Sequence, residues 1–458
     1  MSISRLIYKN LPVFLQNSVC TVYGYKESKL RFGGKYDECY NSLLCSQWMS
    51  SVDIQSLQEE NLTKLINYSY KNIPYYNKVF KQVGLLPSDI NSIDDLEKIP
   101  ILTKEIVRER YHELINPNFK GEVIHTQTSG STGKALNFLF SKDAIQYRWA
   151  LWFRHKSRFN VTKNDAYATF TGLVAIPIEQ SQPPYWRENY AMKQTVFTMH
   201  HITAEKVGSI VDRLNQGGFV YYSGYPSILY SLATIIENEG LEITAPPRVI
   251  FTGAETLLEE HKFRISKVFQ CIVTDQYGFS EGAGNASSCE YGVFHEDFEY
   301  GILECLNKDK YELKISGDVI GTGFTNLAMP FIRYQVEDRA TWTLEKCKCG
   351  RNSKVLTKIE GRSEDYVITP EGSKILRFDY IFKGLVNIQE AQVIQYNLGS
   401  ITINIVKRDG YSIKDEDLLV RHVRSKISPR LNVKFNYVDE IARETTGKLR
   451  AVRSYLKK

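Results

Sequence analysis

The sequence predicts an α/β fold, with a large N-terminal domain of parallel-type sheets flanked by helices and a smaller α+β domain after it. Three observations lead to this prediction. The chain has 458 residues, about three times a typical domain of ~150 residues. Short β-rich runs alternate with helical runs from about residue 122, which is typical of mostly parallel sheets. The pattern changes again after residue 361, where strands surround one basic helix.

The first hundred residues are predicted to be mainly helical. Within residues 61–80, apolar side chains recur at helical spacing, and Pro74 ends this helix. A second helix begins within residues 99–111. Thr103 is a suitable N-cap for it, because its hydroxyl can accept a free backbone N–H, and Glu105 in the first turn complements the helix dipole.

The next elements are strands, each followed by a loop or turn. We expect strands at residues 219–222, 249–252 and 272–274. In parallel α/β sheets, ligands bind where loops leave the C-terminal ends of the strands, so the site is expected there. The last unit is predicted to hold strands at 391–395, 401–406 and 433–437 and a helix at 416–427. The segment GRSEDYVI marks the boundary between two domains, 1–361 and 362–458.

Composition excludes several classes of protein. A net charge of +6 over this length, without clustered basic runs, gives no support to nucleic-acid binding. With 43% hydrophobic and 24% charged residues, the chain is ordinary for a globular protein, and disorder or a coiled coil is excluded as its main architecture. No apolar run is long enough for a transmembrane segment, and the N-terminal residues lack the pattern of a signal peptide. The sequence therefore predicts a cytoplasmic protein whose eight cysteines are thiols.

A glycine- and hydroxyl-rich segment, TSGSTGK, is a candidate phosphate-binding loop. Glycines let the backbone bend around an anion, hydroxyls donate hydrogen bonds, and the lysine neutralises charge. The segment is not a P-loop, because Ala135 follows the lysine where Ser or Thr is needed for magnesium. A flexible connector is the alternative on composition alone. The candidate residues are Thr128, Ser129, Gly130, Ser131, Thr132, Gly133 and Lys134.

Further segments stand in a definite order along the chain. They are L-x-x-L-I-x-Y-x-Y-x-N-I-P-Y-Y and IPILTK before the TSGSTGK loop, then FTGAE, YGFSE, RYQVEDRA, GRSED and TTGKLR after it. This set resembles the acyl-adenylate-forming superfamily, and within it the branch of phenylacetate–CoA ligase and the CapK-type capsule biosynthesis proteins. The resemblance covers nearly the whole chain. Each segment alone is a weak signal, but the six from TSGSTGK to TTGKLR, in the family's order, are a strong one.

The resemblance implies roles for individual residues in ATP binding and adenylate formation. The TSGSTGK loop would bind phosphate, and Gly253, Ala254 and Glu255 would line adenine. In the segment of Tyr277, Gly278, Ser280 and Glu281, the tyrosine would flank adenine and Glu281 would ligate Mg²⁺. Asp338 would hold the ribose hydroxyls, with an ion pair to Arg339 or Arg333 as the alternative. Tyr277 has an alternative as a core aromatic side chain.

The family likeness also implies a mobile C-terminal domain. Lys448 would be the catalytic lysine that reaches the α-phosphate, with a solvated lysine in a basic tail as the alternative. Arg362 would form a hinge ion pair or contact phosphate or ribose, and Glu364 would be the hinge residue. The family usually has Asp or Lys at this hinge, and Glu is a modest departure that keeps the charge. Rotation of the C-terminal domain about this hinge would switch the enzyme from the first half-reaction to the second.

A second group of residues is predicted to bind zinc. Thiolates with one imidazole suit tetrahedral Zn²⁺, and the spacing here is C-x5-H followed by C-x-C. Members of the phenylacetate–CoA ligase-like branch carry Cys or His at these places, which implies a closed, structural site. Unrelated cysteines and an exposed histidine are the alternative. The four residues are Cys289, His295, Cys347 and Cys349.

The substrate is less well defined by the sequence. Residues expected near the acyl pocket are Phe197, His200, His201 and Tyr225, and the two histidines are either pocket walls or satisfied polar side chains. The resemblance implies an AMP-forming ligase that uses ATP, Mg²⁺ and a small carboxylic acid and passes the acyl group to an amine or sugar, with a setting in surface polysaccharide assembly. An acyl-CoA ligase with CoA as the thiol acceptor and a non-catalytic zinc-stabilised binding protein are the alternatives. We expect a monomer or homodimer.

Overall fold

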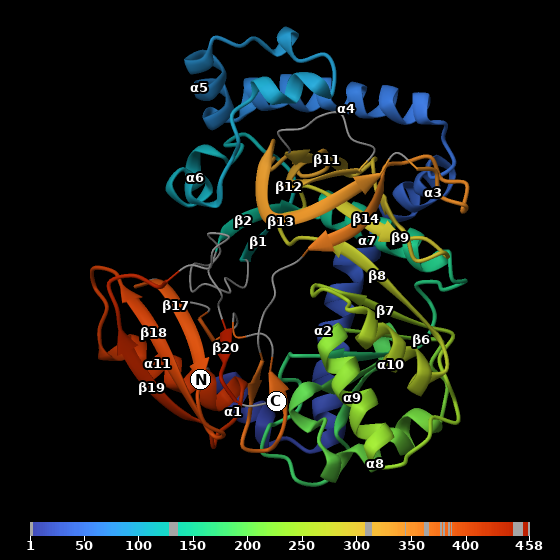
Figure 1. Ribbon diagram of the computed structural model, residues 1–458, viewed down its shortest axis with the longest axis vertical. Coiled ribbons are helices and arrows are strands. Elements are labelled where there is room, and N and C mark those ends of the chain that lie inside the picture. The colour runs from blue at the N-terminus through green and yellow to red at the C-terminus, as the bar shows by residue number, and fades with distance from the viewer. Residues whose placement is uncertain are drawn as a thin grey trace.

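The computed structural model describes residues 3–127, 136–306, 314–343, 345–360, 366–375, 378, 381–382, 385, 387–442 and 452–456. Its largest feature is a 12-stranded sheet with the order β11-β12-β13-β14-β10-β9-β8-β7-β6-β3-β5-β4. Figure 1 shows α4, α5 and α6 over one end of the molecule, α8, α9 and α10 around the other end of the sheet, and the C-terminal strands to one side. The predicted α/β architecture is confirmed.

The N-terminal part is helical, as predicted. Pro74 ends one helix and begins the next, because proline lacks an N–H but fits the first position of a helix. The Oγ1 of Thr103 accepts the N–H of Ile106 at 3.3 Å, which confirms the N-cap of α6. The helices are α1 (Ile3–Asn10), α2 (Val13–Phe32), α3 (Tyr36–Ser46), α4 (Ser51–Asn72), α5 (Pro74–Val83) and α6 (Lys104–Glu109).

One half of the large sheet is parallel and is covered by helices. Strands β5, β3, β6, β7 and β8 run parallel, with β4 antiparallel at the edge. The first predicted strand lies two residues later than expected, and the third extends further to Gly278. The elements are α7 (Lys142–Ser157), β3 (Tyr167–Thr171), β4 (Trp186–Asn189), β5 (Gln194–Thr198), α8 (Ala204–Asn215), β6 (Tyr221–Gly224), α9 (Pro226–Asn238), β7 (Val249–Gly253), α10 (Glu259–Phe269) and β8 (Ile272–Gly278).

The other half of the sheet is antiparallel, so the expectation of mostly parallel pairing was wrong there. The connections between these strands are too short for crossover helices, which need roughly a dozen residues. β9 and β10, for example, are separated only by residues 289–293. The strands are β9 (Asn285–Ser288), β10 (Phe294–Glu296), β11 (Gly301–Leu306), β12 (Lys314–Gly323), β13 (Tyr334–Thr343) and β14 (Val355–Glu360).

A separate four-stranded sheet, of order β19-β18-β17-β20, lies near the C-terminus with one helix. Its strands match the three predicted ranges closely, and the helix begins three residues before the predicted range. Its elements are β17 (Ile388–Gln395), β18 (Ser400–Lys407), α11 (Ile413–Lys426), β19 (Asn432–Tyr437) and β20 (Val452–Ser454). Two small hairpins complete the strands: β1 (Val123–Gln127) with β2 (Asn137–Ser141), and β15 (Val367–Ile368) with β16 (Lys374–Ile375).

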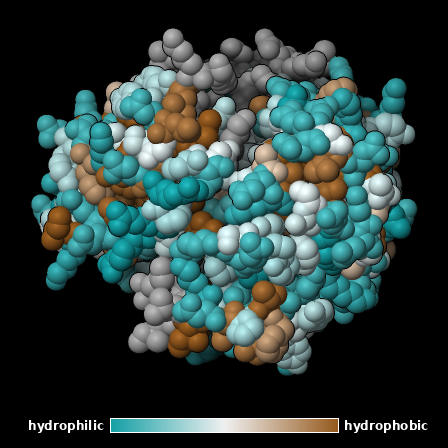
Figure 2. Space-filling view, turned by 90° about the horizontal axis from the view of Figure 1, so that it is seen from below, coloured by the Kyte–Doolittle hydropathy of each residue, from teal (hydrophilic) through white to brown (hydrophobic). Residues whose placement is uncertain are grey.

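Two large hydrophobic clusters form the core. One joins the parallel half of the sheet and its helices, together with apolar residues of the C-terminal sheet. The other packs α4 to α6 against the antiparallel half. From below, the surface is mostly hydrophilic, with hydrophobic residues in separate patches (Figure 2). Among the helices of the described ranges, none has the length and hydropathy needed to cross a bilayer.

Candidate active site

The candidate nucleotide site lies at the C-terminal ends of two neighbouring parallel strands, β7 and β8. Their pairing places Gly253 beside Gln276, so the loops that follow both strands leave the sheet at the same edge. Ala254 has a φ of 67°, which turns the chain sharply away from β7. Gly278, the last residue of β8, and Ser280, two residues after it, are exposed. The predicted placement at the strand ends therefore holds for these residues.

A hydrogen bond joins two of the predicted nucleotide-binding residues. The hydroxyl of Tyr277 on β8 donates to the Oδ2 of Asp338 on β13 at 3.1 Å, although the two residues are 61 positions apart in sequence. Arg333 pairs with Glu304 at 3.0 Å, and the Nη1 of Arg339 lies 3.9 Å from the Oδ1 of Asp318. A tyrosine and a carboxylate held together in this way can flank a base and accept ribose hydroxyls.

Glu281 is buried, and its carboxylate accepts the hydroxyl of Tyr334 at 2.6 Å through Oε1. Gly282 follows with a φ of 69°, and a Cβ there would lie 2.5 Å from the ring of Phe140. This close turn requires glycine and keeps Glu281 against the end of β13. Sequence reasoning missed Tyr334 as the partner of Glu281, although its position in the RYQVEDRA segment was a usable signal.

A second acidic residue near the strand ends was also missed. The Oγ1 of Thr252 on β7 donates to the Oδ1 of Asp275 on β8 at 2.8 Å. Burial raises the pKa of Asp275 to about 7, so this carboxyl group takes up or releases a proton near neutral pH. The only signal in the sequence was an aspartate two positions before the tyrosine of YGFSE.

Glu255 has a structural contact in this arrangement. Its Oε2 accepts the backbone N–H of Ser227 at 3.2 Å, at the first turn of α9. A carboxylate there complements the positive end of the helix dipole and ties the loop after β7 to the loop after β6.

Several predicted residues lie outside the described residues. These are the TSGSTGK loop of residues 128–134, Arg362 and Glu364 of the expected hinge, and Lys448. Their roles in phosphate binding, hinge motion and catalysis stay predictions.

The residues expected near the acyl pocket are largely core side chains. Phe197 is fully buried and stacks on Phe170, with ring centroids 5.1 Å apart. His201 is also fully buried, lies 3.0 Å from the Oγ1 of Thr198 and stacks on the ring of Tyr185. Burial, with nearby positive charges, lowers the pKa of His201 to about 3, so it is a neutral residue within the core.

The four predicted zinc ligands come together in space. All four donor atoms lie within 4.8 Å of one another. Cys289 directly follows β9, His295 lies on β10, and the other two lie in the turn between β13 and β14, so two parts of the chain more than 50 positions apart meet here. Cys289 Sγ lies 3.7 Å from Cys347 Sγ, and Cys349 Sγ lies 3.3 Å from His295 Nε2.

These distances and charges suit a tetrahedral metal ion. Zinc–sulfur bonds of about 2.3 Å and zinc–nitrogen bonds of about 2.0 Å place tetrahedral ligand atoms roughly 3.5 to 3.8 Å apart. Burial lowers the pKa of His295 to about 4, helped by the charges of Arg158 and Arg351, so its imidazole is neutral and able to ligate. Although burial opposes it, hydrogen bonding to Arg351 lowers the pKa of Cys349. The donor set therefore fits Zn²⁺.

Comparison with known proteins shows what this chain is similar to. A family model for the CapK C-terminal domain matches residues 367–455. Protein CapK of Staphylococcus aureus is 24% identical over 454 residues, which cover 97% of this chain and 98% of that protein. The phenylacetate-coenzyme A ligase of Escherichia coli is 27% identical, over 70% of this chain and 74% of its own length.

A solved structure shares the fold. It is 2-hydroxyisobutyryl-CoA ligase in complex with 2-HIB-AMP and CoA in the thioesterification state, with a TM-score of 0.56 and 16% identity. The match covers 89% of this chain and 91% of that one. The fold that the two chains share is that of adenylate-forming ligases. By sequence the chain is similar to CapK and to the phenylacetate–CoA ligases, which agrees with the resemblance found in its motifs.

Proposed function

We propose that this chain is an AMP-forming ligase that activates a small carboxylic acid with ATP and passes the acyl group to an amine or a sugar. In the first half-reaction, a carboxylate oxygen of the acid attacks the α-phosphorus of ATP, and the bond to pyrophosphate breaks. In the second, the acceptor attacks the acyl carbon and AMP leaves. The setting we propose is the assembly of a surface polysaccharide in the cytoplasm.

The observation that carries this proposal is the hydrogen bond between Tyr277 and Asp338. It joins two of the segments to which the family resemblance assigns nucleotide binding, although they are 61 positions apart in sequence. In our proposal the ring of Tyr277 flanks adenine, while Asp338 accepts the two ribose hydroxyls. An ionised carboxylate has about four acceptor sites, so Asp338 can serve ribose and Tyr277 together.

Glu281 is the residue that would hold Mg²⁺, an ion that prefers carboxylate and phosphate oxygens. The Oε1 of Glu281 is engaged by Tyr334, and the carboxylate has further lone pairs to offer. When bound, Mg²⁺ would neutralise charge on the phosphate oxygens. The hydrogen bond from Tyr334 fixes the orientation of the carboxylate before any ligand arrives, which lowers the cost of ordering it.

Charge on the phosphates also requires cations from the protein. We propose that the loop of residues 128–134 binds phosphate and that Lys448 reaches the α-phosphate and the acid's carboxylate oxygen. Residues 362–458 would act as a mobile lid that turns about Glu364 between the two half-reactions, with Arg362 beside the hinge. The presence of a separate C-terminal sheet with its own helix supports this division.

The proposed acceptor follows from how much of this chain each group of relatives matches. Similarity to CapK extends over 97% of this chain, and a CapK model matches the C-terminal unit. The phenylacetate–CoA ligases match about 70% of it. We therefore favour an amine or a sugar as the acceptor, in the assembly of a surface polysaccharide. Transfer to CoA is the second candidate, supported by the likeness to phenylacetate–CoA ligases.

ATP–pyrophosphate exchange over a panel of aryl acetates, fatty acids, amino acids and uronic acids tests the first half-reaction. We expect exchange with one acid, lost in Lys448→Ala and retained in the matched variant Lys457→Ala from the same basic tail. Addition of CoA, amines and sugars in turn then identifies the acceptor that speeds AMP release. Binding of ATP without exchange for any acid would favour the alternative of a non-catalytic, zinc-stabilised binding protein.

We also propose that the cluster of Cys289, His295, Cys347 and Cys349 binds one structural Zn²⁺. The four donor atoms would fill all four positions of a tetrahedral ion, which would leave no position for substrate. The ion would tie the turn between β13 and β14 to β9 and β10. Metal analysis of protein from zinc-replete cells tests this, and less than a few tenths of an equivalent would contradict it.

A further inference from the structure

The helix α2 presents a hydrophobic face to the outside of the molecule. Phe14 is 66% exposed and Val22 is 60% exposed. Leu15, Val19, Val22, Lys26 and Lys29 follow one another at intervals of four and three residues, so they form one stripe along the helix. The outward face of α2 consists of Phe14, Leu15, Val19, Val22, Tyr23 and Tyr25, all exposed.

Two amide side chains of α2, Gln16 and Asn17, point inward, whereas a surface helix usually turns its apolar side chains toward the core. Arg187, which is fully buried on β4, donates to Gln16 at 2.7 Å. Asn17 accepts the N–H of Glu188 at 3.0 Å, so α2 covers the open edge of the large sheet through hydrogen bonds. A Cβ at Gly24 would lie 2.1 Å from the side chain of Asn189, which shows how closely helix and strand approach. The outward face is therefore not needed to hold α2 in place.

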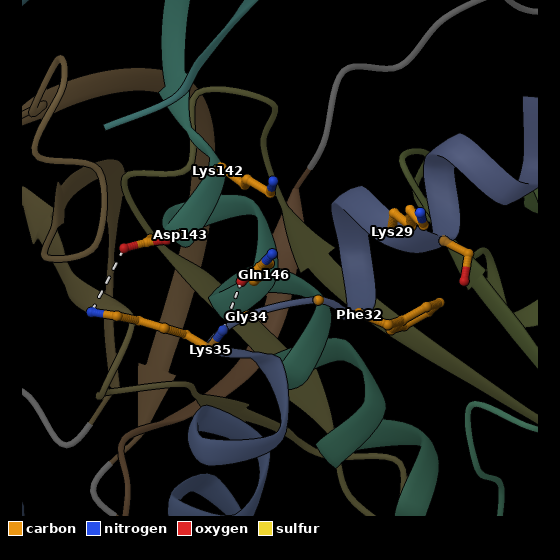
Figure 3. Close-up of a pocket in the computed structure, with 9 residues that line it drawn as sticks. Lys29, Phe32, Gly34, Lys35, Lys142, Asp143 and Gln146 are labelled. Carbon is orange, nitrogen blue, oxygen red and sulfur yellow. Dashed lines mark hydrogen bonds and ion pairs between the residues drawn. The ribbon is translucent and has the colours of Figure 1, made fainter. Parts of the chain in front are cut away.

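A basic pocket lies at the C-terminal end of the same helix. It has a volume of about 610 Å³ and is lined by the last turn of α2, the Gly33–Gly34 turn and the first turn of α7. Three lysines line it against one acid, Asp143. Figure 3 shows Lys35 extended toward Asp143, from which its Nζ lies 3.6 Å away. Both side chains are largely exposed, so this ion pair is weak and can rearrange.

One donor in the pocket wall has no acceptor. Gln146 is 1% exposed and lines the pocket. Its Oε1 accepts the backbone N–H of Lys35 at 2.9 Å, which fixes the direction of the amide. Its Nε2 is then a buried donor without a hydrogen-bond partner within the described part of the chain. A buried donor left unsatisfied is costly, and an anionic oxygen in the pocket would satisfy it.

The stripe on α2 leads directly into this pocket, because Lys29 belongs to both. We propose that the outward face of α2 lies on an anionic lipid bilayer and that the pocket receives the phosphate of a phospholipid headgroup. An amphipathic helix in this position binds in the plane of the interface, with its apolar side chains among the acyl chains and its lysines at the phosphates.

The distribution of charge favours lipid over a second copy of the chain. The first 35 residues contain six basic residues and one acidic residue, Glu27, which pairs with Arg31 at 2.7 Å. A symmetric dimer would place this face against itself, and the face offers no further acid to meet its lysines. An anionic membrane supplies both the apolar phase and the negative charge.

Vesicle co-sedimentation with the full chain tests the proposal. We use phosphatidylcholine vesicles, alone or with about one-third phosphatidylglycerol as the anionic lipid. We expect sedimentation with the anionic vesicles only. Val22→Glu should weaken binding to the anionic vesicles at least about tenfold, because the substitution removes an apolar side chain proposed to lie among the acyl chains and adds a charge that the anionic lipid repels. Lys29→Gln and Lys35→Gln should each weaken it about fivefold.

Val52→Glu on α4 is the matched control, since Val52 is 71% exposed on another helix. It should sediment like the unmodified chain, and circular dichroism checks that each variant is folded. Sedimentation with neither vesicle, equal sedimentation with both, or equal loss in Val52→Glu would overturn the proposal. A Val22-dependent dimer without vesicle binding would assign the face to a second copy. Lys29-dependent binding of inorganic phosphate without vesicle binding would assign the pocket to a soluble anion.

Discussion

Replacing Tyr277 with phenylalanine tests the geometry of the nucleotide site most directly. The change keeps the ring that is proposed to flank adenine and removes only the hydroxyl that donates to Asp338 at 3.1 Å. A hydrogen bond to a charged group is worth about 1.5 to 3 kcal/mol when buried. Because Asp338 is only partly buried, the lower end of this range applies. We therefore expect the dissociation constant of ATP to rise about tenfold, which corresponds to roughly 1.4 kcal/mol.

Isothermal titration calorimetry with ATP measures this effect without knowledge of the acid. Asp338→Ala and the double variant complete a double-mutant cycle, which isolates the interaction between the two side chains. We expect a coupling energy of about 1 kcal/mol, so Tyr277→Phe should have little effect once Asp338 is replaced. Tyr291→Phe, at an exposed position, is the matched control. Additive effects of the two substitutions, or an equal loss in the control, would refute the role we assign to this pair.

Three further predictions concern the carboxylates and the cysteine cluster. Glu281→Gln should lower the rate of ATP–pyrophosphate exchange by at least about tenfold and raise the Mg²⁺ concentration needed for half-maximal activity, because the lost charge is proposed to hold the ion. An unchanged dependence on Mg²⁺ would contradict this role. Cys347→Ser should lose bound zinc and unfold at a lower temperature. Cys45→Ser, at an exposed cysteine outside the cluster, should keep its zinc and its unfolding temperature. Equal zinc content in the two variants would exclude the site. Burial raises the pKa of Asp275 to about 7. Between about pH 4 and pH 7 the folded chain therefore keeps a proton on this carboxyl group that the unfolded chain has released. The free energy of unfolding should accordingly fall as the pH rises through this range, by up to about 1.4 kcal/mol per pH unit. Asp275→Asn should remove this slope in urea unfolding at pH 5 and pH 7, and an unchanged slope would show that Asp275 is not its source.

Local features of the sequence determined much of the molecule. The cap at Thr103, the break at Pro74 and the alternation of strands and helices depend on neighbours along the chain, and these predictions were confirmed. The order of the family's segments was likewise sufficient to recognise the superfamily. The spacing of Cys289 to His295 and of Cys347 to Cys349 identified four residues that do come together.

Contacts between distant segments were decided only by the tertiary structure. The pairing of Tyr277 with Asp338 and of Glu281 with Tyr334 depends on how β8 and β13 are placed, and no local pattern contains that information. The antiparallel half of the sheet follows from short connections, which composition does not reveal.

The orientation of α2 shows the difference most clearly. By its sequence alone, a helix is expected to bury its apolar side chains and expose its polar ones. In this structure the amide groups of Gln16 and Asn17 meet the open edge of β4, so the apolar face is left outside. The physical reason is that an unpaired strand edge and a buried arginine both need hydrogen-bond partners, and their position relative to α2 exists only once the chain has folded.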